Sequence, residues 1–227
     1  MLMGIQLEKC RRNPWAILAR VPFITFEGVE GCGKSTQMEL LAGHLRSIGR
    51  ACRITREPGG TAIGERIRAI LMDTAHAELD PMAEWLLIEA ARRQHVVDVI
   101  RPAFREDALL LCDRFSDSTE AYQTAGRGLD AATVSALDER VREGTVPDLT
   151  LLYDLDVAEG LARARRRDGG VDGRFEAADE AMHERVRSRY LDIARREPER
   201  VAVISVRGGA ETVFADTWRI VSRRFGL

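Results

Sequence analysis

The chain has 227 residues, and its 34 basic and 36 acidic side chains leave a net charge of -2. This near balance argues against a broad nucleic-acid-binding surface, and no apolar run approaches the ~20 residues of a membrane span. We therefore expect one soluble globular domain with no membrane or nucleic-acid partner. Four scattered cysteines, at positions 10, 32, 52 and 112, form no C-x-x-C pair and indicate reduced thiols in a cytoplasmic protein.

Residues 1–21 are expected to form a flexible N-terminal extension, ahead of a single domain at 22–227. Basic residues there surround only a short apolar stretch, from Trp15 to Ala19, which is too short for a secretory signal peptide. An organellar presequence is the alternative, but Glu8 and the lack of serine fit it poorly.

An apolar run that begins at Phe23 breaks into glycines and then into a helical pattern. Gly28, Gly33, Lys34 and Ser35 fit G-x-x-x-x-G-K-[ST], in which backbone N–H groups surround phosphate oxygens. Lys34 adds a mobile charge for the β and γ phosphates, and Ser35 offers a hydroxyl to Mg²⁺ at a helix N-terminus. The segment predicted to bind ATP comprises Gly28, Val29, Glu30, Gly31, Cys32, Gly33, Lys34, Ser35 and Thr36.

Helical and strand patterns alternate along the rest of the chain. Further strands are expected at 51–55, 108–112, 149–153 and 200–206. Helices are expected at 35–48, 63–72, 81–104, 116–124, 133–142, 157–167, 175–197 and 210–224. This order predicts an α/β fold of three layers, a five-stranded parallel sheet with helices on both faces, and ligands at the carboxyl ends of the strands.

Several of the predicted strands end in charged residues. Lys34 follows the first strand, Glu57 follows the second, and Asp113 and Arg114 follow the third. A carboxylate directly after a buried strand is typical of a group that holds or orients Mg²⁺, so Ser35 and Asp113 form the candidate metal site, directly or through water. The alternative for Asp113 is a helix cap or a structural partner of Arg114.

On the helix expected at 81–104, Ile88 and Arg92 lie one turn apart on the same face. An apolar surface beside a guanidinium could hold a base and its phosphate, whereas the alternative is an exposed arginine on an amphipathic helix. Glu89, next to them, is interpreted as a solvated residue.

Three segments, at 27–31, 56–61 and 113–123, together resemble the thymidylate kinases of bacterial type, and the resemblance runs from Phe23 nearly to the C-terminus. It implies the P-loop NTPase fold of nucleoside monophosphate kinases, with a short arginine-rich lid at about 163–176. It also implies γ-phosphoryl transfer from ATP to dTMP, dependence on Mg²⁺ and a homodimer.

The resemblance also assigns roles to single residues. Arg68, Arg92 and Arg114 would bind the acceptor phosphate, a task that suits the planar guanidinium. Tyr122 and Gln123 would face the deoxyribose and the thymine edge. The implied catalytic residues are Lys34, Asp113, Arg114, Arg167 and Arg174, the last two from the lid, since Cys32 stands in a phosphate loop that lacks an extra arginine. The implied substrate-binding residues are Glu30, Glu57, Pro58, Arg68, Ile88, Arg92, Arg114, Ser118, Tyr122 and Gln123.

Ile88 departs from the family pattern, which commonly has a phenylalanine there to stack on thymine. The aliphatic side chain gives up an aromatic stacking term of ~0.5 to 1.5 kcal/mol. A deoxynucleoside kinase is the main competing interpretation, with Glu57 or Glu30 as the base, although several arginines suited to a second phosphate argue against it. A GTPase switch would need an Asn-Lys-x-Asp motif, and Asn13 is the only asparagine.

Overall fold

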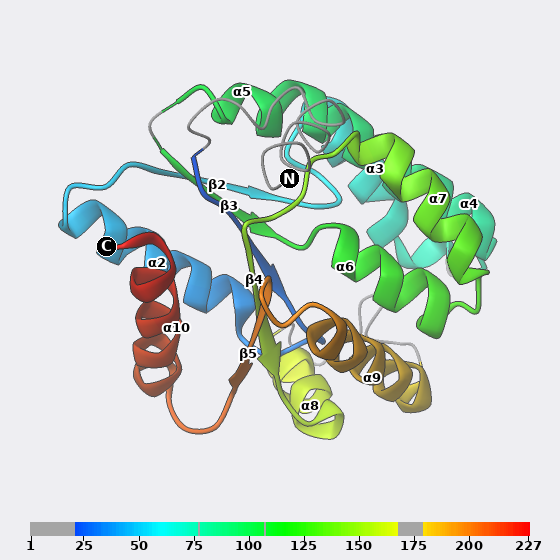
Figure 1. Cartoon of the computed structure of the whole chain (residues 1–227). Coiled ribbons are helices and arrows are strands. Elements are labelled where there is room, and N and C mark those ends of the chain that lie inside the picture. The colour runs from blue at the N-terminus through cyan, green and yellow to red at the C-terminus, as the bar shows by residue number, and fades with distance from the viewer. Residues whose placement is uncertain (1–20, 77, 107, 168–178) are drawn as a thin grey trace, which may run out of the picture.

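The computed structural model describes residues 21–76, 78–106, 108–167 and 179–227, with the side chain of Arg167 left out. Its sheet has five strands in the order β2-β3-β1-β4-β5, and every pairing is parallel (Figure 1). The strands are β1 (Phe23–Glu27), β2 (Cys52–Arg56), β3 (Leu109–Asp113), β4 (Leu149–Asp154) and β5 (Val201–Ser205).

Helices cover both faces of this sheet. In Figure 1, α2 and α10 lie on one face, while α9, α6 and the run from α4 to α5 lie on the other. The helices are α2 (Lys34–Ser47), α3 (Ala62–Met72), α4 (Pro81–His95), α5 (Arg101–Ala103), α6 (Ser116–Thr119), α7 (Ala131–Arg142), α8 (Val157–Arg167), α9 (Glu180–Arg196) and α10 (Ala210–Phe225). A 3₁₀ turn, η1 (Thr74–His76), and two π-helical segments, η2 (Val96–Ile100) and η3 (Glu120–Gly126), complete the described elements.

The predicted fold class is confirmed, and the strands lie within two residues of their expected bounds. The helix expected at 81–104 is one helical run, interrupted by a π segment over 96–100, and the helix expected at 116–124 likewise passes from α6 into η3. Asp113 is the last residue of β3 rather than the first residue after it. Helix α9 begins at Glu180, and residues 175–178 of the helix expected at 175–197 lie outside the described residues.

Some predictions fall outside the described residues. These include the extension at 1–20, Arg174 and most of the lid, and of Arg167 only the helical backbone is described. Among the described residues, no helix is long and apolar enough to cross a membrane.

The strand register fixes where the chemistry lies. Phe26 and Arg56 both pair with Asp113, so the first three strands in the order β2-β3-β1 end at the same level. All five residues of β1 are buried, as is expected for a central strand of a parallel sheet. The loops that leave β1, β2 and β3 therefore meet at one edge over a rigid core.

Candidate active site

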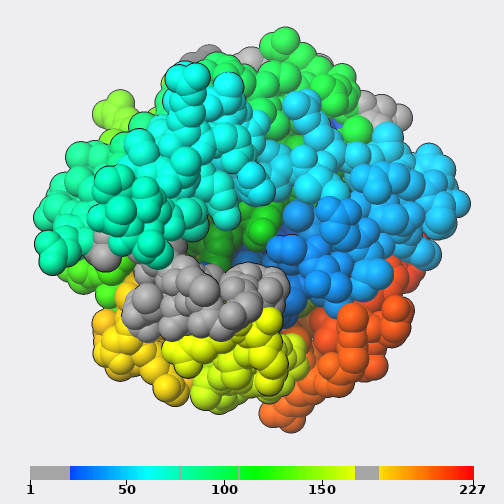
Figure 2. All heavy atoms as spheres, turned by 180° about the vertical axis from the view of Figure 1, so that it is seen from behind, coloured from blue at the N-terminus to red at the C-terminus, as the bar shows by residue number. Residues whose placement is uncertain are grey.

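The carboxyl edge of the sheet is hollowed into a cleft. Figure 2 shows the hollow between the α3 region, in cyan, and the phosphate-loop region, in blue. The residues that line it are Glu30, Gly31, Lys34, Ser35, Glu57, Pro58, Arg68, Met72, Ile88, Arg92, Asp113, Arg114, Phe115, Ser118, Thr119, Tyr122 and Gln123. Most of the residues singled out from the sequence are in this set, although they come from segments that are far apart in the chain, from Glu30 to Gln123.

The phosphate loop has the backbone that its glycines permit. Gly31 and Gly33 have positive φ angles of 69° and 87°, and a Cβ on Gly31 would come within 1.9 Å of the carbonyl oxygen of Gly160. Lys34 is buried, and its Nζ donates to the carbonyl oxygens of Gly28 and Val29, each at 2.9 Å. The loop thus holds an ammonium group at the wall of the cleft.

The side chains of two loop residues point away from any ligand. Val29 and Cys32 belong to the buried core, so their part in binding ATP would be played by their backbone N–H groups. Neither residue lines the cleft, and the same holds for Gly28, Gly33 and Thr36.

Ser35 and Asp113 form a pair of oxygen donors at the phosphate-loop end. The Ser35 hydroxyl donates to Asp113 Oδ2 at 3.4 Å, while Asp113 Oδ1 is buried and has no hydrogen-bond partner. An unpartnered buried carboxylate oxygen beside a hydroxyl fits a hard cation such as Mg²⁺. The described residues contain no cluster of three or more acidic, histidine or cysteine ligands, so such an ion would take its other ligands from phosphates and water, as Mg²⁺ commonly does.

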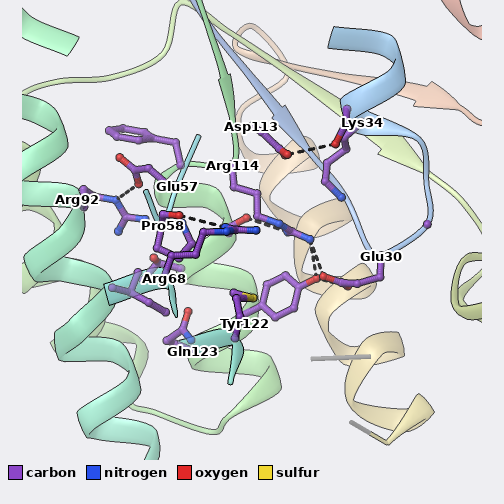
Figure 3. Close-up of a pocket in the computed structure, with 17 residues that line it drawn as sticks. Glu30, Lys34, Glu57, Pro58, Arg68, Arg92, Asp113, Arg114, Tyr122 and Gln123 are labelled. Atoms are coloured by element: carbon purple, nitrogen blue, oxygen red, sulfur yellow. Dashed lines mark hydrogen bonds and ion pairs between the residues drawn. The ribbon is translucent and has the colours of Figure 1, made fainter. Parts of the chain in front are cut away.

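Arg114 occupies the centre of the cleft. Its φ angle of 66° is left-handed, an unusual conformation for a non-glycine residue and one that marks functional positions. Its guanidinium donates to Glu30 at 2.7 Å and to the Tyr122 hydroxyl at 3.2 Å (Figure 3). It also donates to the hydroxyls of Ser118 and Tyr190, each at 3.1 Å. The guanidinium is thereby held in one position.

The protonation states of this group support one another. Burial opposes the charge of Arg114, but Tyr122 and Glu30 outweigh burial and raise the pKa of Arg114. Burial likewise disfavours the charged form of Glu30, but Arg114 and Lys34 lower its pKa. Glu30 and Arg114 therefore form a permanent ion pair.

Two residues that support this centre escaped the sequence analysis. Glu27 is fully buried at the end of β1 and accepts hydrogen bonds from the Phe115 N–H (2.7 Å), the Ser118 hydroxyl (2.6 Å) and the Tyr190 hydroxyl (3.0 Å). Burial, followed by the charge of Asp117, raises the pKa of Glu27 to about 7. An acidic residue at the end of an apolar strand was a visible signal for Glu27, whereas Tyr190, on α9, carries no local signal.

Arg68 differs from Arg114 in having little compensation. Its guanidinium donates to the carbonyl oxygen of Pro58 at 3.1 Å, and it makes no ion pair with any described residue. Burial, followed by the charge of Arg56, lowers the pKa of Arg68. Its positive charge therefore faces the cleft, where an anion could neutralise it.

Arg92 has the opposite environment. It is 1% exposed, and it donates from Nε to Glu57 (2.8 Å) and from one terminal nitrogen to Glu89 (2.8 Å) and Asp138 (3.0 Å). These interactions outweigh burial and raise its pKa. The prediction that Glu89 is solvated is wrong: its side chain is 3% exposed, and burial raises its pKa to about 6.

The far end of the cleft combines apolar and amide groups. Ile88 is nearly buried in its wall, one turn of α4 before Arg92. Gln123, on η3, is 1% exposed, and its amide nitrogen donates to Glu84 Oε1 at 3.0 Å. Tyr122 donates to Glu30 and so connects this end to the centre.

Figure 3 shows how the cleft is organised from end to end. Lys34 and Asp113 lie at one end, Arg92 and Gln123 at the other, and Arg68 and Arg114 between them. Such an arrangement can hold a phosphate donor on the loop and a second, smaller phosphate ester in the middle. The apolar end with its amide can hold a heterocyclic base.

Comparison with known proteins finds one family. A family model described as thymidylate kinase matches residues 26–216. The thymidylate kinase of Caulobacter vibrioides is 48% identical over 205 residues, which cover 90% of this chain and 98% of the relative. That of Trichlorobacter lovleyi is 48% identical over 186 residues, covering 80% and 88%. The crystal structure of thymidylate kinase from Ehrlichia chaffeensis aligns with a TM-score of 0.71 at 33% identity, covering 89% of this chain and 99% of that one.

Proposed function

The chain belongs to the thymidylate kinase family and transfers a phosphoryl group from ATP to dTMP, giving dTDP, and we propose that both substrates meet in the cleft described above. The observation that carries this placement is the position of Arg68 and Arg114 between a phosphate loop and an apolar end. This order fits two anionic substrates, because the phosphate loop and the arginines face phosphate groups and the apolar end faces a base.

Phosphoryl transfer needs reactants held in line and neutralisation of charge more than it needs covalent chemistry. In our proposal Lys34 and the loop N–H groups bind the ATP phosphates. Ser35 and Asp113 would hold Mg²⁺, which when bound neutralises and orients phosphate oxygens. The dTMP phosphate is already an anionic nucleophile, so no general base is required.

We assign the acceptor phosphate to Arg68 and Arg114. The positive charge of Arg68 is not balanced by a carboxylate among the described residues, so it is available to a phosphate. Arg114 is held by Glu30, Ser118 and the tyrosines, so its position is set before the substrate binds. Pro58 takes part by holding Arg68 through its carbonyl oxygen.

Arg92 receives a different role from the one that the family resemblance implied. Arg92 already pairs with three carboxylates, which more than balance its charge, whereas Arg114 pairs with one, that of Glu30. Arg92 is therefore a poor ligand for a phosphate dianion. We propose that Arg92, with Ile88 and Gln123, lines the site of the thymine base, and that Glu57 acts by holding Arg92.

The remaining assignments stay proposals. Arg167 and Arg174 would bring charge to the migrating phosphoryl group from the lid at about 163–176. The single domain would span 22–227, with 1–21 as an extension. Free thiols at Cys32, Cys52 and Cys112 support a cytoplasmic location, where thiols stay reduced.

A homodimer is supported by an apolar surface on α3 and α4, which pack side by side. Large apolar side chains exposed by 42 to 53% recur there at helical spacing. They are Ile63, Ile70, Met82 and Leu86. Sedimentation of the wild type and of a Leu86→Glu variant tests this surface, and an unchanged dimer in the variant would place the interface elsewhere.

A deoxynucleoside kinase is not favoured. That chemistry needs a carboxylate base near the sugar, and Glu30 and Glu57 were the candidates. Arg114 and Arg92, respectively, counter the effect of burial and lower the pKa of these two carboxyls, which makes both weak bases.

The test is ADP release with Mg-ATP and a panel of dTMP, dUMP, dGMP, AMP and thymidine. We expect a preference for dTMP. Turnover of thymidine but not of dTMP would remove the acceptor-phosphate roles of Arg68 and Arg114.

A further inference from the structure

The amide of Gln123 is held in one of its two possible orientations. Its nitrogen donates to Glu84 Oε1 at 3.0 Å, while its oxygen has no protein partner among the described residues and is left for the cleft. An amide can be turned by 180° so that donor and acceptor change places. The group that prevents this turn therefore determines whether Gln123 offers an acceptor or a donor to a ligand in the cleft.

Glu84 is itself fixed by Arg127. This carboxylate is 0% exposed, and Arg127 donates to both of its oxygens, from Nε at 3.1 Å and from a terminal nitrogen at 2.9 Å. A carboxylate that is paired in this way accepts hydrogen bonds and donates none. If the Gln123 amide turned, two acceptor oxygens would face each other about 3.0 Å apart in a buried site.

We propose that Glu84 and Arg127 are positioning residues that fix the Gln123 amide and thereby select the acceptor base. The fixed amide oxygen accepts the N3–H of thymine or uracil. Cytosine carries an acceptor at N3, so it meets an acceptor, and the amide cannot turn to accommodate it. The inference rests on the proposed placement of the base at this end of the cleft.

Selection of this kind works by excluding the wrong partner as well as by binding the right one. A site that hydrogen-bonds a substrate group rejects an analogue strongly because its own polar group is left unpaired. In this proposal, Glu84 controls the rejection of cytosine through the Gln123 amide, without itself touching the substrate.

Glu84→Gln tests the inference, because a glutamine at 84 can donate as well as accept and so permits the turn. We compare kcat/KM for dTMP, dUMP and dCMP. The expected result is that the preference for dTMP over dCMP narrows by at least about tenfold, while the ratio of dTMP to dUMP stays unchanged, since both carry N3–H. An equal loss for all three nucleotides would overturn the proposal.

Two further variants separate positioning from general damage. Arg127→Lys gives up one of the two donors but keeps a positive charge beside Glu84, so the carboxylate stays an acceptor and the preference for dTMP over dCMP should stay as in the wild type. A preference that narrows as far as in Glu84→Gln would mean that the acceptor character of Glu84 does not fix the amide. Asp117→Asn disrupts a comparable buried pair, since Asp117 accepts from Arg200 through both oxygens away from the cleft, and it should also leave the preference unchanged. A narrowed preference in Asp117→Asn would show that the effect is nonspecific and overturn the proposal.

Calorimetric binding of dTMP and dCMP to the same variants gives a readout that does not need turnover. If Glu84→Gln is too unstable for kinetics, the ratio of the two Kd values at low temperature carries the same test. Failure of the proposed function looks different, since the wild type would then show no preference for dTMP.

Discussion

Arg68 and Arg92 line the same cleft, yet the protein treats their charges in opposite ways. Arg92 is surrounded by three carboxylates that raise its pKa, whereas Arg68 contacts one carbonyl oxygen and burial lowers its pKa. A compensated arginine contributes structure and position, and an uncompensated one is available to a ligand. The comparison shows that residue type and proximity to a site do not by themselves define a role.

The largest effect should come from removing the compensated charge. Arg92→Met leaves Glu57, Glu89 and Asp138 facing one another in a buried cluster. We expect the free energy of unfolding to fall by roughly 3 to 5 kcal/mol, the usual cost of breaking a buried ion pair from one side. Chemical denaturation measures it. A variant with wild-type stability and no activity on dTMP would instead restore Arg92 as a phosphate ligand.

Removing the uncompensated charge of Arg68 should have the opposite consequence, a loss of activity with little loss of stability. Arg68→Met is expected to lower kcat/KM for dTMP about 10²-fold, the scale of losing one well-placed charged donor, with little change in stability. Steady-state kinetics and thermal melting test this together. Arg56→Met is the control, because Arg56 lies nearby but is half-exposed and pairs with Glu65. Comparable kinetic losses in both variants would mean that the effect is long-range electrostatics.

The difference between these two arginines could not be predicted from sequence. The phosphate loop, the strand ends and the helix that carries Ile88 and Arg92 were all visible, because they depend on local pattern and on the rule that parallel strands end at one edge. The partners of Arg92 come from three separate segments, and only Glu89, at i-3, was within local reach. Whether an arginine charge is balanced by carboxylates depends on how distant segments pack together, and local sequence patterns do not show this.

The same limit applies to the supporting residues. Gln123 was assigned to the base, but no role was predicted for Glu84 and Arg127, which we propose orient it, since helix α4 and the end of η3 meet only in the folded chain. Glu27 carried a signal at the end of β1 that was not used. Functional groups were therefore easier to predict than the groups that hold them.

A third prediction concerns the excess of negative charge around Arg92. Burial, opposed by Arg92 and reinforced by Asp138 and Glu57, raises the pKa of Glu89 from 4.5 to about 6. The native state then binds more protons than the unfolded state between these values, so Glu89 lowers stability as pH rises through them. In Glu89→Gln this loss is absent, and the stability of the variant relative to wild type should rise by about 2 kcal/mol between pH 4.5 and pH 7.

Denaturant titrations of both proteins across this pH range measure the difference. A difference that is flat with pH would mean that Glu89 has the same pKa in the native and unfolded states, because Arg92 then fully offsets the effect of burial. Arg92 would then have less surplus negative charge around it than the three contacts indicate.

The smallest effect, on the affinity for dTMP, is expected from a substitution of Ile88, in the wall of the proposed base site. The side chain lines the cleft one turn before Arg92, at the position where the family resemblance implies an aromatic ring. Ile88→Phe should restore a stacking surface worth ~0.5 to 1.5 kcal/mol, so that the Kd for dTMP falls by a factor of about two to ten. The Kd for ATP should not change, because the phosphate loop lies at the other end. Ile88→Leu keeps the volume without the ring and serves as the control.

A weaker affinity in Ile88→Phe would carry its own information about the cluster. Ile88 is 8% exposed and directly precedes Glu89, which accepts a hydrogen bond from Arg92, so a larger ring must find space in a buried wall. If the Kd for dTMP rises and the protein also melts at a lower temperature, overpacking has displaced Arg92 and its carboxylates. If the Kd for dTMP rises without any change in melting temperature, the phenylalanine ring occupies the site of the base itself. The thymine base would then lie against α4.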